Sequence, residues 1–315
     1  MLSRTADHLF WLARYIERAE NMARLLDITW QTSLAPHTTE SASLNWQAAL
    51  CCHDQLPAYL KAYEEVTAEK VLAFMVFDAQ NPSSIFSCLK AARENAHAVR
   101  GTLTQEMWET INSTWLDVLK ISKQSLGNEE IAEFFDWVKT RSSLSRGVTF
   151  GTMLHDEAFY FIRLGTYIER ADNTARLLDV KYYLIAAGDA IGTSADYYQW
   201  GALLRSVSAF ELYRRVYRGS VSPDRVADLL IIRADMPRSL NACMIEVEAM
   251  LQKLSNQHSQ ETQRLAGQLS AELRYARIEE ILEDGLHPFL ESFQQRVFEL
   301  GMRVSQDFLL PMRVA

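Results

Sequence analysis

One segment of fourteen residues occurs twice in this chain of 315 residues, and this repetition constrains the fold more than any other feature of the sequence. The first copy, YIERAENMARLLDI, runs from Tyr15 to Ile28, and the second, YIERADNTARLLDV, runs from Tyr167 to Val180. Eleven of the fourteen positions are identical, and the charged residues are kept as closely as the apolar ones. A chain that repeats a segment in this way is expected to repeat the structural unit that contains it.

The repetition extends well beyond this segment. Glu169 follows Glu17 by 152 residues, and later matches keep the same order at offsets of 154 and 155 residues. These matches pair Trp46 with Trp200, Tyr59 with Tyr213, Pro82 with Pro237, Ser84 with Ser239 and Cys88 with Cys243. We therefore predict two homologous halves, residues 1–151 and 152–315, packed as one compact unit about a pseudo-twofold axis.

The residues between these matches predict helices. The chain has only 12 glycines and 7 prolines, whereas a strand-rich fold needs many turns. Ser222 and Pro223 fit the cap and the first position of a helix, and Thr67 stands at the equivalent place in the first half. Pro82 and Pro237 are expected to open the helices that follow. We predict an all-α fold with about six helices in each half, joined by short loops.

Two boundaries can be placed from single residues. Pro57 predicts a kink or a restart in the first half, at the place where the second half has Glu211 in a helix without any break signal. Gly127 and Asn128, followed by acidic residues, predict the stop of one helix and the cap of the next.

On a helical projection, the first copy of the segment and the residues before it separate into two arcs. The apolar arc holds Leu9, Leu12, Tyr15, Ile16, Ala19, Met22, Ala23 and Leu26. The charged arc holds Arg14, Glu17, Arg18, Glu20, Asn21, Arg24 and Asp27. The apolar arc belongs in the core, so the open question is where the charged arc lies.

The charged arc has two interpretations. A solvated face would be stabilised by pairs that contribute only about 0.2–0.5 kcal/mol each, whereas a buried network loses about 3–5 kcal/mol when one partner is removed. A solvated face would accept Lys for Arg or Gln for Asn, but the two copies keep the same residue types. We therefore favour burial or a functional groove over the solvated face. If the two copies face each other, the expected crosswise pairs are Glu17 with Arg170 or Arg176, and Glu169 with Arg18 or Arg24.

The candidate site is the polar cluster that both copies would form. Its members, as candidates for a polar cluster or a ligand-binding site, are Arg14, Glu17, Arg18, Asn21, Arg24, Glu169, Arg170, Asn173 and Arg176. The arginines suit a carboxylate or a phosphate, and the two glutamates could act as general acid or base if burial raised their pKa values. The balance of Glu and Arg favours internal neutralisation over an exposed anion site.

No familiar catalytic motif accompanies this cluster. The sequence has no GxGxxG, Walker, GxSxG or HExxH pattern, so no catalytic residue is assigned and no cofactor is predicted. The four cysteines show no CxxC or zinc spacing, so no metal site is predicted. Cys88 and Cys243 match between the halves and are expected to pack in the core. The change from His53-Asp54 to Val207-Ser208 argues against a shared role for these two pairs.

Charge and composition exclude several classes of function. The net charge of −8 argues against non-specific binding to nucleic acid. The N-terminus is charged from Arg4 onward and has no long apolar run, so neither a signal peptide nor a membrane span is predicted. Few cysteines without a secretory leader fit a reducing compartment, and the cytoplasm is the expected location.

The two regions that carry the motif, LSRTADHLFWLARYIERAENMARLLD (Leu2–Asp27) and GTMLHDEAFYFIRLGTYIERADNTARLLD (Gly151–Asp179), resemble the bacterial alpha-E domain family. This family is a duplicated helical domain with a recurring Glu-Arg motif, and the resemblance covers essentially the whole chain. One departure is Thr166, because family members often have an arginine at this place. Any role of Arg14 therefore has no chemical counterpart in the second half.

The resemblance implies a context rather than a reaction. Members of the family are encoded with or fused to ATP-grasp proteins and transglutaminase-like proteins, and ATP-grasp enzymes join carboxylates to amines. The first hypothesis is a non-catalytic helical partner or accessory subunit of an ATP-grasp-type amide or peptide ligase system. The alternative is an enzyme of amide-bond formation or hydrolysis that uses the Glu/Arg/Asn cluster. A purely structural cluster that joins the halves is compatible with the first hypothesis.

Overall fold

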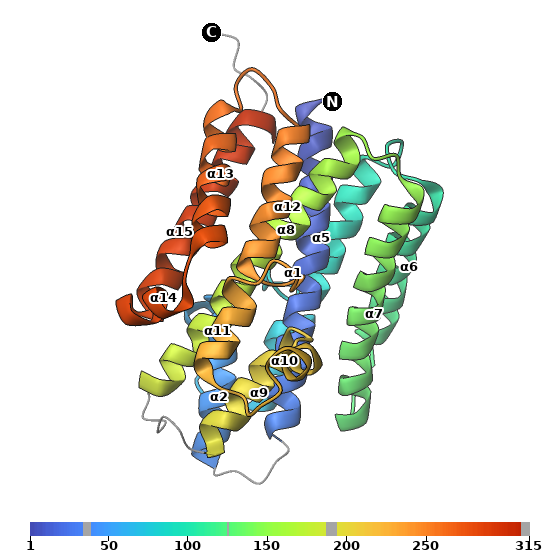
Figure 1. Cartoon of the computed structure of the whole chain (residues 1–315). Coiled ribbons are helices and arrows are strands. Elements are labelled where there is room, and N and C mark those ends of the chain that lie inside the picture. Colours follow the sequence, from blue (N-terminus) through green and yellow to red (C-terminus); the bar gives the residue numbers. More distant parts are fainter. Residues whose placement is uncertain (34–38, 125, 187–193, 310–315) are drawn as a thin grey trace.

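The computed structural model describes residues 1–33, 39–124, 126–186 and 194–309. These residues form fifteen α-helices and two π-helical turns, and no strand occurs among them, so the all-α prediction is confirmed. Two long helices, α1 (Ser3–Ser33) and α8 (Glu157–Ala186), run through the centre of an elongated bundle (Figure 1). Within the described ranges, no helix combines the length and the apolar character needed to span a membrane.

Six helices and one π-helical turn follow α1 before α8 begins. They are α2 (Thr39–Cys52), α3 (Leu56–Ala62), α4 (Ala68–Leu72), η1 (Ala73–Phe77), α5 (Ile85–Ala98), α6 (Gln105–Ile121) and α7 (Asn128–Thr152). After α8 come α9 (Ser194–Ser206), α10 (Phe210–Tyr217), α11 (Pro223–Ile231), α12 (Leu240–Lys253), α13 (Gln260–Tyr275), α14 (Ile278–Asp284), α15 (Leu286–Val304) and η2 (Ser305–Leu309). The prediction of about six helices per half is therefore too low, because short helices such as α10 and α14 are separate from their neighbours.

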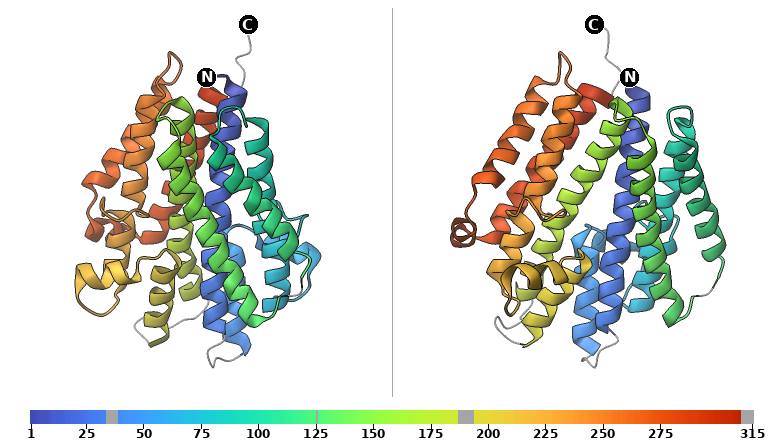
Figure 2. Two further views of the ribbon diagram at one scale, coloured as in Figure 1. Left: turned by 90° about the vertical axis from the view of Figure 1, so that its right-hand side faces the viewer. Right: turned by 45° about the vertical axis from the view of Figure 1, so that its right-hand side comes forward.

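The packing around α1 has the same pattern as the packing around α8. Helix α1 contacts α5 and α7, and α8 contacts α12 and α15, which follow at equivalent places in the chain. Helix α2 packs on α8, and α9 packs on α1. Helix α6 lies with α5 and α7 on one flank, and α13 lies with α12 and α15 on the opposite flank (Figure 2). Because α1 and α8 also contact each other, residues on their facing sides lie in the middle of the molecule.

Helices α1 and α8 approach each other closely at Gly165. A Cβ atom at this position would lie 2.4 Å from the carbonyl oxygen of Phe10 and 3.3 Å from the Cβ of Ala13, so the observed approach requires glycine. Glu17 and Glu169 follow one helical turn after Ala13 and Gly165. The close approach therefore sets the distance at which the two charged arcs meet.

Apolar side chains from both predicted halves share one large core. Leu9 and Leu12 of α1, Ile168 of α8 and Val247 of α12 are buried in the same cluster. A second cluster lies among helices of residues 1–151, around the buried side chain of Trp46. The apolar arc of α1 contributes to both clusters, as its periodicity predicts.

Cys88 and Cys243 pack in the core as predicted. Both are fully buried and both are free thiols. Burial raises the pKa of each thiol to about 12, so neither is a reactive thiolate at neutral pH.

Several predicted helix starts are confirmed. Thr67 caps α4 by accepting a hydrogen bond from the backbone NH of Lys70. Ser222 and Pro223 occupy the cap and the first turn of α11. Pro57 lies in the first turn of α3, so the predicted restart occurs.

Other starts differ from the prediction by one to three residues. Pro82 and Pro237 lie in the turns before α5 and α12, and the serines two residues later cap these helices by accepting backbone NH groups. Gly127 rather than Asn128 is the cap of α7, and its NH donates to the side chain of Glu130 at 2.7 Å. At α5 and α12 the serine that closes the first hydrogen bonds, rather than the proline, marks the boundary.

The predicted unbroken helix around Glu211 is wrong. Helices α9 and α10 are separated by a turn, as are α2 and α3. At each break a residue other than glycine has left-handed backbone geometry, namely Asp54 and Ser208, each with φ of 55°. The backbone NH of the next residue donates to the carbonyl five residues earlier, which closes the end of the preceding helix.

Candidate functional site

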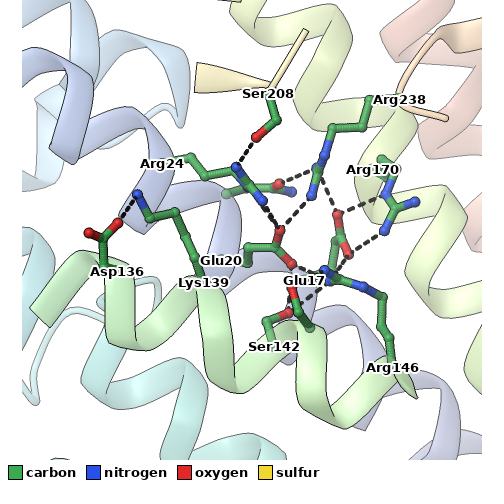
Figure 3. Close-up of polar contacts among 12 residues, drawn as sticks. Glu17, Glu20, Arg24, Asp136, Lys139, Ser142, Arg146, Arg170, Ser208 and Arg238 are labelled. Carbon is green, nitrogen blue, oxygen red and sulfur yellow. Dashed lines mark hydrogen bonds and ion pairs between the residues drawn. The ribbon is translucent and has the colours of Figure 1, made fainter. Parts of the chain in front are cut away.

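The two Glu-Arg motifs meet crosswise between α1 and α8. Arg170 donates from Nε and Nη2 to the two carboxylate oxygens of Glu17, both at 2.9 Å (Figure 3). Arg18 donates in the same way to Glu169, from Nε at 2.6 Å and from Nη2 at 3.1 Å. Each planar guanidinium group thus forms a bidentate pair with the glutamate of the other motif. These two crosswise pairs confirm the expectation for Arg170 and Arg18.

Three of the four members of these pairs are buried, and the fourth, Arg18, is partly exposed. Glu17 is 1% exposed, Glu169 is 5% exposed and Arg170 is 8% exposed. Glu20 and Asn21, on the same arc of α1, are also buried. The interpretation of this arc as a solvated face is therefore wrong for the residues at its centre.

Glu169 has a second arginine partner on α1. Arg14 donates from Nε to Glu169 Oε2 at 2.7 Å. Burial acts to raise the pKa of Glu169, but Arg14 and Arg18 outweigh this effect and lower the pKa to about 2. The residue equivalent to Arg14 in α8 is Thr166, whose hydroxyl donates to a carbonyl of its own helix, so Glu17 has no such partner on α8.

Glu17 is instead bound by two further arginines from outside the repeated segment. Arg238, in the turn before α12, donates from Nη1 to Glu17 and to Asn21 Oδ1, both at 3.0 Å. Its Nη2 donates to Glu20 Oε1 at 2.6 Å. Arg146 of α7 donates to Glu17 at 3.3 Å and also contacts Glu20 (Figure 3). The position equivalent to Arg238 in the first half is a serine, so the repeat gives no signal for this residue.

The carboxylates of Glu17 and Glu20 lie among an excess of positive charge. Their guanidinium partners are Arg24, Arg146, Arg170 and Arg238. Burial acts to raise the pKa of both carboxyl groups, but the arginines outweigh it and hold both pKa values below their ordinary range. Both groups therefore remain ionised at neutral pH and are weak bases, which leaves them unsuited to general acid or base catalysis.

Arg24 and Arg176 do not reach the glutamate of the opposite motif, so Arg18 and Arg170 are the members of the two expected alternatives that form the crosswise pairs. Arg24 and Arg176 each pair with the acidic residue one turn earlier in their own helix. Arg24 Nε donates to Glu20 at 2.8 Å, and Arg176 Nε donates to Asp172 at 2.8 Å. The spacing of four residues brings these groups together on one face of a helix.

The same two arginines bind the left-handed turns across the interface. Arg24 Nη1 donates to Ser208 Oγ at 2.6 Å, and Arg176 Nη1 donates to Asp54 Oδ2 at 2.5 Å. Each arginine thus reaches from one predicted half to the turn of the other. Asp54 and Ser208 have equivalent positions, φ values and partners, so they share a structural role although their residue types differ.

Asp172 has fewer cationic partners than Glu20, and its pKa shifts in the opposite direction. Burial raises the pKa of Asp172, and Arg176 offsets this only in part. Glu20, at the equivalent place in α1, has several arginine partners, and its pKa is lowered. The two halves therefore differ in their electrostatics although their motifs match.

The asparagines of the motif are buried and incompletely paired. Among the described residues, Asn21 Nδ2 and Asn173 Oδ1 have no hydrogen-bond partner, and neither does the nearby His53 Nδ1. Burial and the charge of Arg176 lower the pKa of His53 to about 4, so this imidazole is neutral at neutral pH.

Hydrogen bonds connect eight of the nine predicted site residues in three groups, and Asn173 is in none of them. Glu17, Asn21, Arg24 and Arg170 are linked through Glu20 and Arg238. Arg14, Arg18 and Glu169 form the second group, and Arg176 belongs to the third with Asp54 and Asp172.

The space beside these groups is small. A hollow lined in part by Glu17, Arg146 and Thr166 has a volume of about 20 Å³, enough for one water-sized group. The described ranges contain no set of three or more His, Cys, Asp or Glu side chains placed to hold a metal ion. The arrangement is suited to holding helices together rather than to enclosing a substrate.

Comparisons with known proteins agree with the motif. Uncharacterized proteins of Mycobacterium tuberculosis and Mycobacterium bovis are 26% identical to the chain over 303 residues, which is 90% of this chain and 34% of each relative. The chain thus spans about a third of the length of these curated relatives. No solved structure matches it.

A family model named Alpha-E, described as "a predicted alpha-helical domain with a conserved ER motif", matches residues 1–309. Glu-Arg pairs occur in both copies of the segment, as Glu17-Arg18 and Glu169-Arg170. Because the match extends over nearly the whole sequence and includes both crosswise pairs, this chain belongs to the Alpha-E family.

Proposed function

We propose that this chain is a non-catalytic helical partner or accessory subunit of an ATP-grasp-type amide or peptide ligase system. The observation that carries the non-catalytic part is the state of the two motif glutamates. Glu17 and Glu169 are buried, bound by arginines and held ionised by lowered pKa values. Groups in this state stabilise a fold, but they offer neither a transferable proton nor a free nucleophile.

The class of partner comes from the family resemblance, in which alpha-E proteins accompany ATP-grasp and transglutaminase-like proteins. The relatives support a role beside other modules, because about two thirds of their length lies outside the match. In this proposal the chain contributes a binding surface and the ligase contributes the chemistry.

We also propose that the chain consists of two homologous halves, 1–151 and 152–315, that pack about a pseudo-twofold axis between α1 and α8. Three reciprocal features support this organisation. The Glu-Arg pairs run in both directions, each of α2 and α9 packs on the central helix of the other half, and the turns at Asp54 and Ser208 each bind an arginine from the other half.

A second candidate is an enzyme of amide-bond formation or hydrolysis. It is favoured by the buried polar atoms without partners at Asn173 and His53, because such atoms often face a ligand or water in a functional site. The raised pKa of Asp172 adds a carboxyl group that is easier to protonate. These groups lack a nucleophile and a sizeable cavity, so this candidate ranks second.

The test is reconstitution of the purified chain with an ATP-grasp-type protein from the same organism. We expect the two proteins to copurify. We also expect the peptide-dependent consumption of ATP by the ligase to be faster when the chain is present. The chain alone should neither hydrolyse ATP nor form amide bonds. Amide chemistry by the chain alone, lost in a folded His53→Ala variant, would favour the enzyme instead.

A further inference from the structure

Helix α10 and the residue that caps its C-terminus expose a cluster of arginines that have no acidic partner in the described part of the chain. These are Arg214, Arg215 and Arg218. Leu212 and Val216 are 39% and 38% exposed, and their spacing places them on the same helix face as Arg215. The whole chain has a net charge of −8, so this surface is a local reversal of charge.

This face of α10 borders an open groove of about 520 Å³. The groove is lined by Leu212, Arg215, Val216, Leu229, Arg233, Asp235 and Met236. Arg233 is already paired with Asp235 through two hydrogen bonds of 2.8 and 2.6 Å, so Arg215 is the lining cation that has no acidic partner. A fitting occupant places an apolar side chain on Leu212 and Val216 and carboxylates beside the exposed arginines.

Helix α14, with the sequence IEEILED, has this composition. Glu279, Glu283 and Asp284 are exposed and have no basic partner within the described residues, and Glu280 has only a 3.8 Å contact with Arg277. The helix also exposes an apolar side chain, Leu282, at 37%. Helix α14 has 7 residues and α10 has 8, so the two are about 10 and 12 Å long and can lie side by side.

The first half has no equivalent surface. At an offset of 154 residues, the counterparts of Leu212, Arg214, Arg215, Val216 and Arg218 are Ala58, Leu60, Lys61, Ala62 and Glu64. The apolar pair is replaced by alanines and the three positive charges by one positive and one negative charge. The basic surface of α10 is therefore not part of the repeated fold but an addition in the second half alone.

We propose that two copies of this chain associate with α10 of each copy against α14 of the other. Helix α11 packs against both α10 and α14, so the basic and acidic surfaces flank it within one copy (Figure 1). A twofold axis passing over α11 forms the same contact twice, as in an isologous dimer. Exposed ion pairs contribute little individually and are screened by salt, so the dimer is expected to be weak and salt-sensitive.

Charge reversal in the full-length chain tests this contact by analytical ultracentrifugation. The first variant carries Arg215→Glu and Arg218→Glu, and the second carries Glu279→Arg and Glu283→Arg. Each variant alone brings like charges together in both contacts, so the dissociation constant of each should rise at least about tenfold. An equimolar mixture restores opposite charges at both contacts and should form heterodimers, and a chain with all four substitutions should form homodimers again. Lys61→Glu on α3, the counterpart of Arg215, should leave association unchanged.

The sedimentation of the unchanged chain is the first test of the proposed dimer. A monomer at every protein concentration and at low salt overturns the proposal, and so does a dimer that the first two variants leave intact. If the chain is monomeric and the α10 variant loses copurification with the ATP-grasp-type protein, the basic surface binds that protein and self-association is wrong. Copurification is measured separately from sedimentation, so failure of the dimer and failure of the proposed function give different results.

Discussion

At the scale of single residues, the buried carboxylates explain why arginine recurs in both motifs. Arg18 and Arg170 each use two nitrogen atoms to reach both oxygens of a glutamate on the other helix. A lysine at either place could reach the carboxylate only as a point charge and could not form the parallel pair. Arg24 and Arg176 also use two nitrogen atoms each, one to contact an acid on their own helix and one to contact a turn across the interface.

The lowered pKa of Glu169 predicts a dependence of stability on pH. Its pKa is about 2 in the folded chain and 4.5 ordinarily, so its charged form stabilises the fold above pH 4.5. This contribution, on the order of 3 kcal/mol, is lost as the pH falls from about 4.5 through about 2. In Glu169→Gln the free energy of unfolding should therefore change less steeply with pH in this range than in the unchanged chain.

Denaturant unfolding followed by circular dichroism between about pH 6 and pH 2 measures this difference. Glu94→Gln serves as the control, because Glu94 is exposed and its one ion pair within the described residues is with its neighbour Arg93. Its pH dependence should follow that of the unchanged chain. Parallel curves for Glu169→Gln and the unchanged chain would show that Glu169 is not held in its charged form by the fold.

The sequence identifies part of this site and misses the rest for a physical reason. Repetition of Glu17 and Arg170 in equivalent segments is enough to predict that they meet. Arg146 and Arg238 cannot be found in this way, because they lie outside the segment and their partners are distant in sequence. The available signal is indirect: two buried glutamates on one helix need more positive charge than one crosswise arginine supplies.

At the scale of helices, long periodic segments are predictable and short breaks are not. The apolar arc is sufficient to predict α1 and α8 as core helices. The break between α9 and α10 depends on Ser208 in left-handed geometry, and serine gives no signal comparable to the Pro57 that marks the same break in the first half. The cap positions are also hard to predict, because Ser84 and Ser239 rather than the preceding prolines close the first hydrogen bonds.

Close packing of α1 on α8 predicts the effect of a methyl group at Gly165. In Gly165→Ala the new Cβ would lie 2.4 Å from a backbone oxygen of Phe10, so the two helices must move apart. We expect a loss of about 1–3 kcal/mol in the free energy of unfolding, although alanine favours helices more than glycine by about 1 kcal/mol. Chemical denaturation measures this change.

Gly147→Ala is the matched control for that substitution. Gly147 is an exposed residue within α7, and a Cβ atom there would have no atom within 4 Å. This variant should be stabilised by up to about 1 kcal/mol through helix propensity alone. If Gly165→Ala gave the same gain, the close approach of α1 and α8 would not limit the size of this residue.

At the scale of the whole molecule, the charged network and the shared core join the two predicted halves. The core cluster includes buried side chains from α1 and α5 as well as from α8 and α12. The Glu-Arg pairs add specific contacts across the same interface, and they fix the register of α1 along α8. In this account the Glu-Arg motif holds the two central helices together.

A double-mutant cycle on Glu17 and Arg170 tests this account most directly. Glu17→Gln, Arg170→Met and the combined variant are compared with the unchanged chain by their free energies of unfolding, with the exposed Arg93–Glu94 pair as a reference. If the pair joins the two helices, the combined loss should be smaller than the sum of the single losses by about 2–3 kcal/mol, whereas the reference pair should couple by less than about 1 kcal/mol. Losses at Glu17 and Arg170 that add to within about 0.5 kcal/mol would contradict the account.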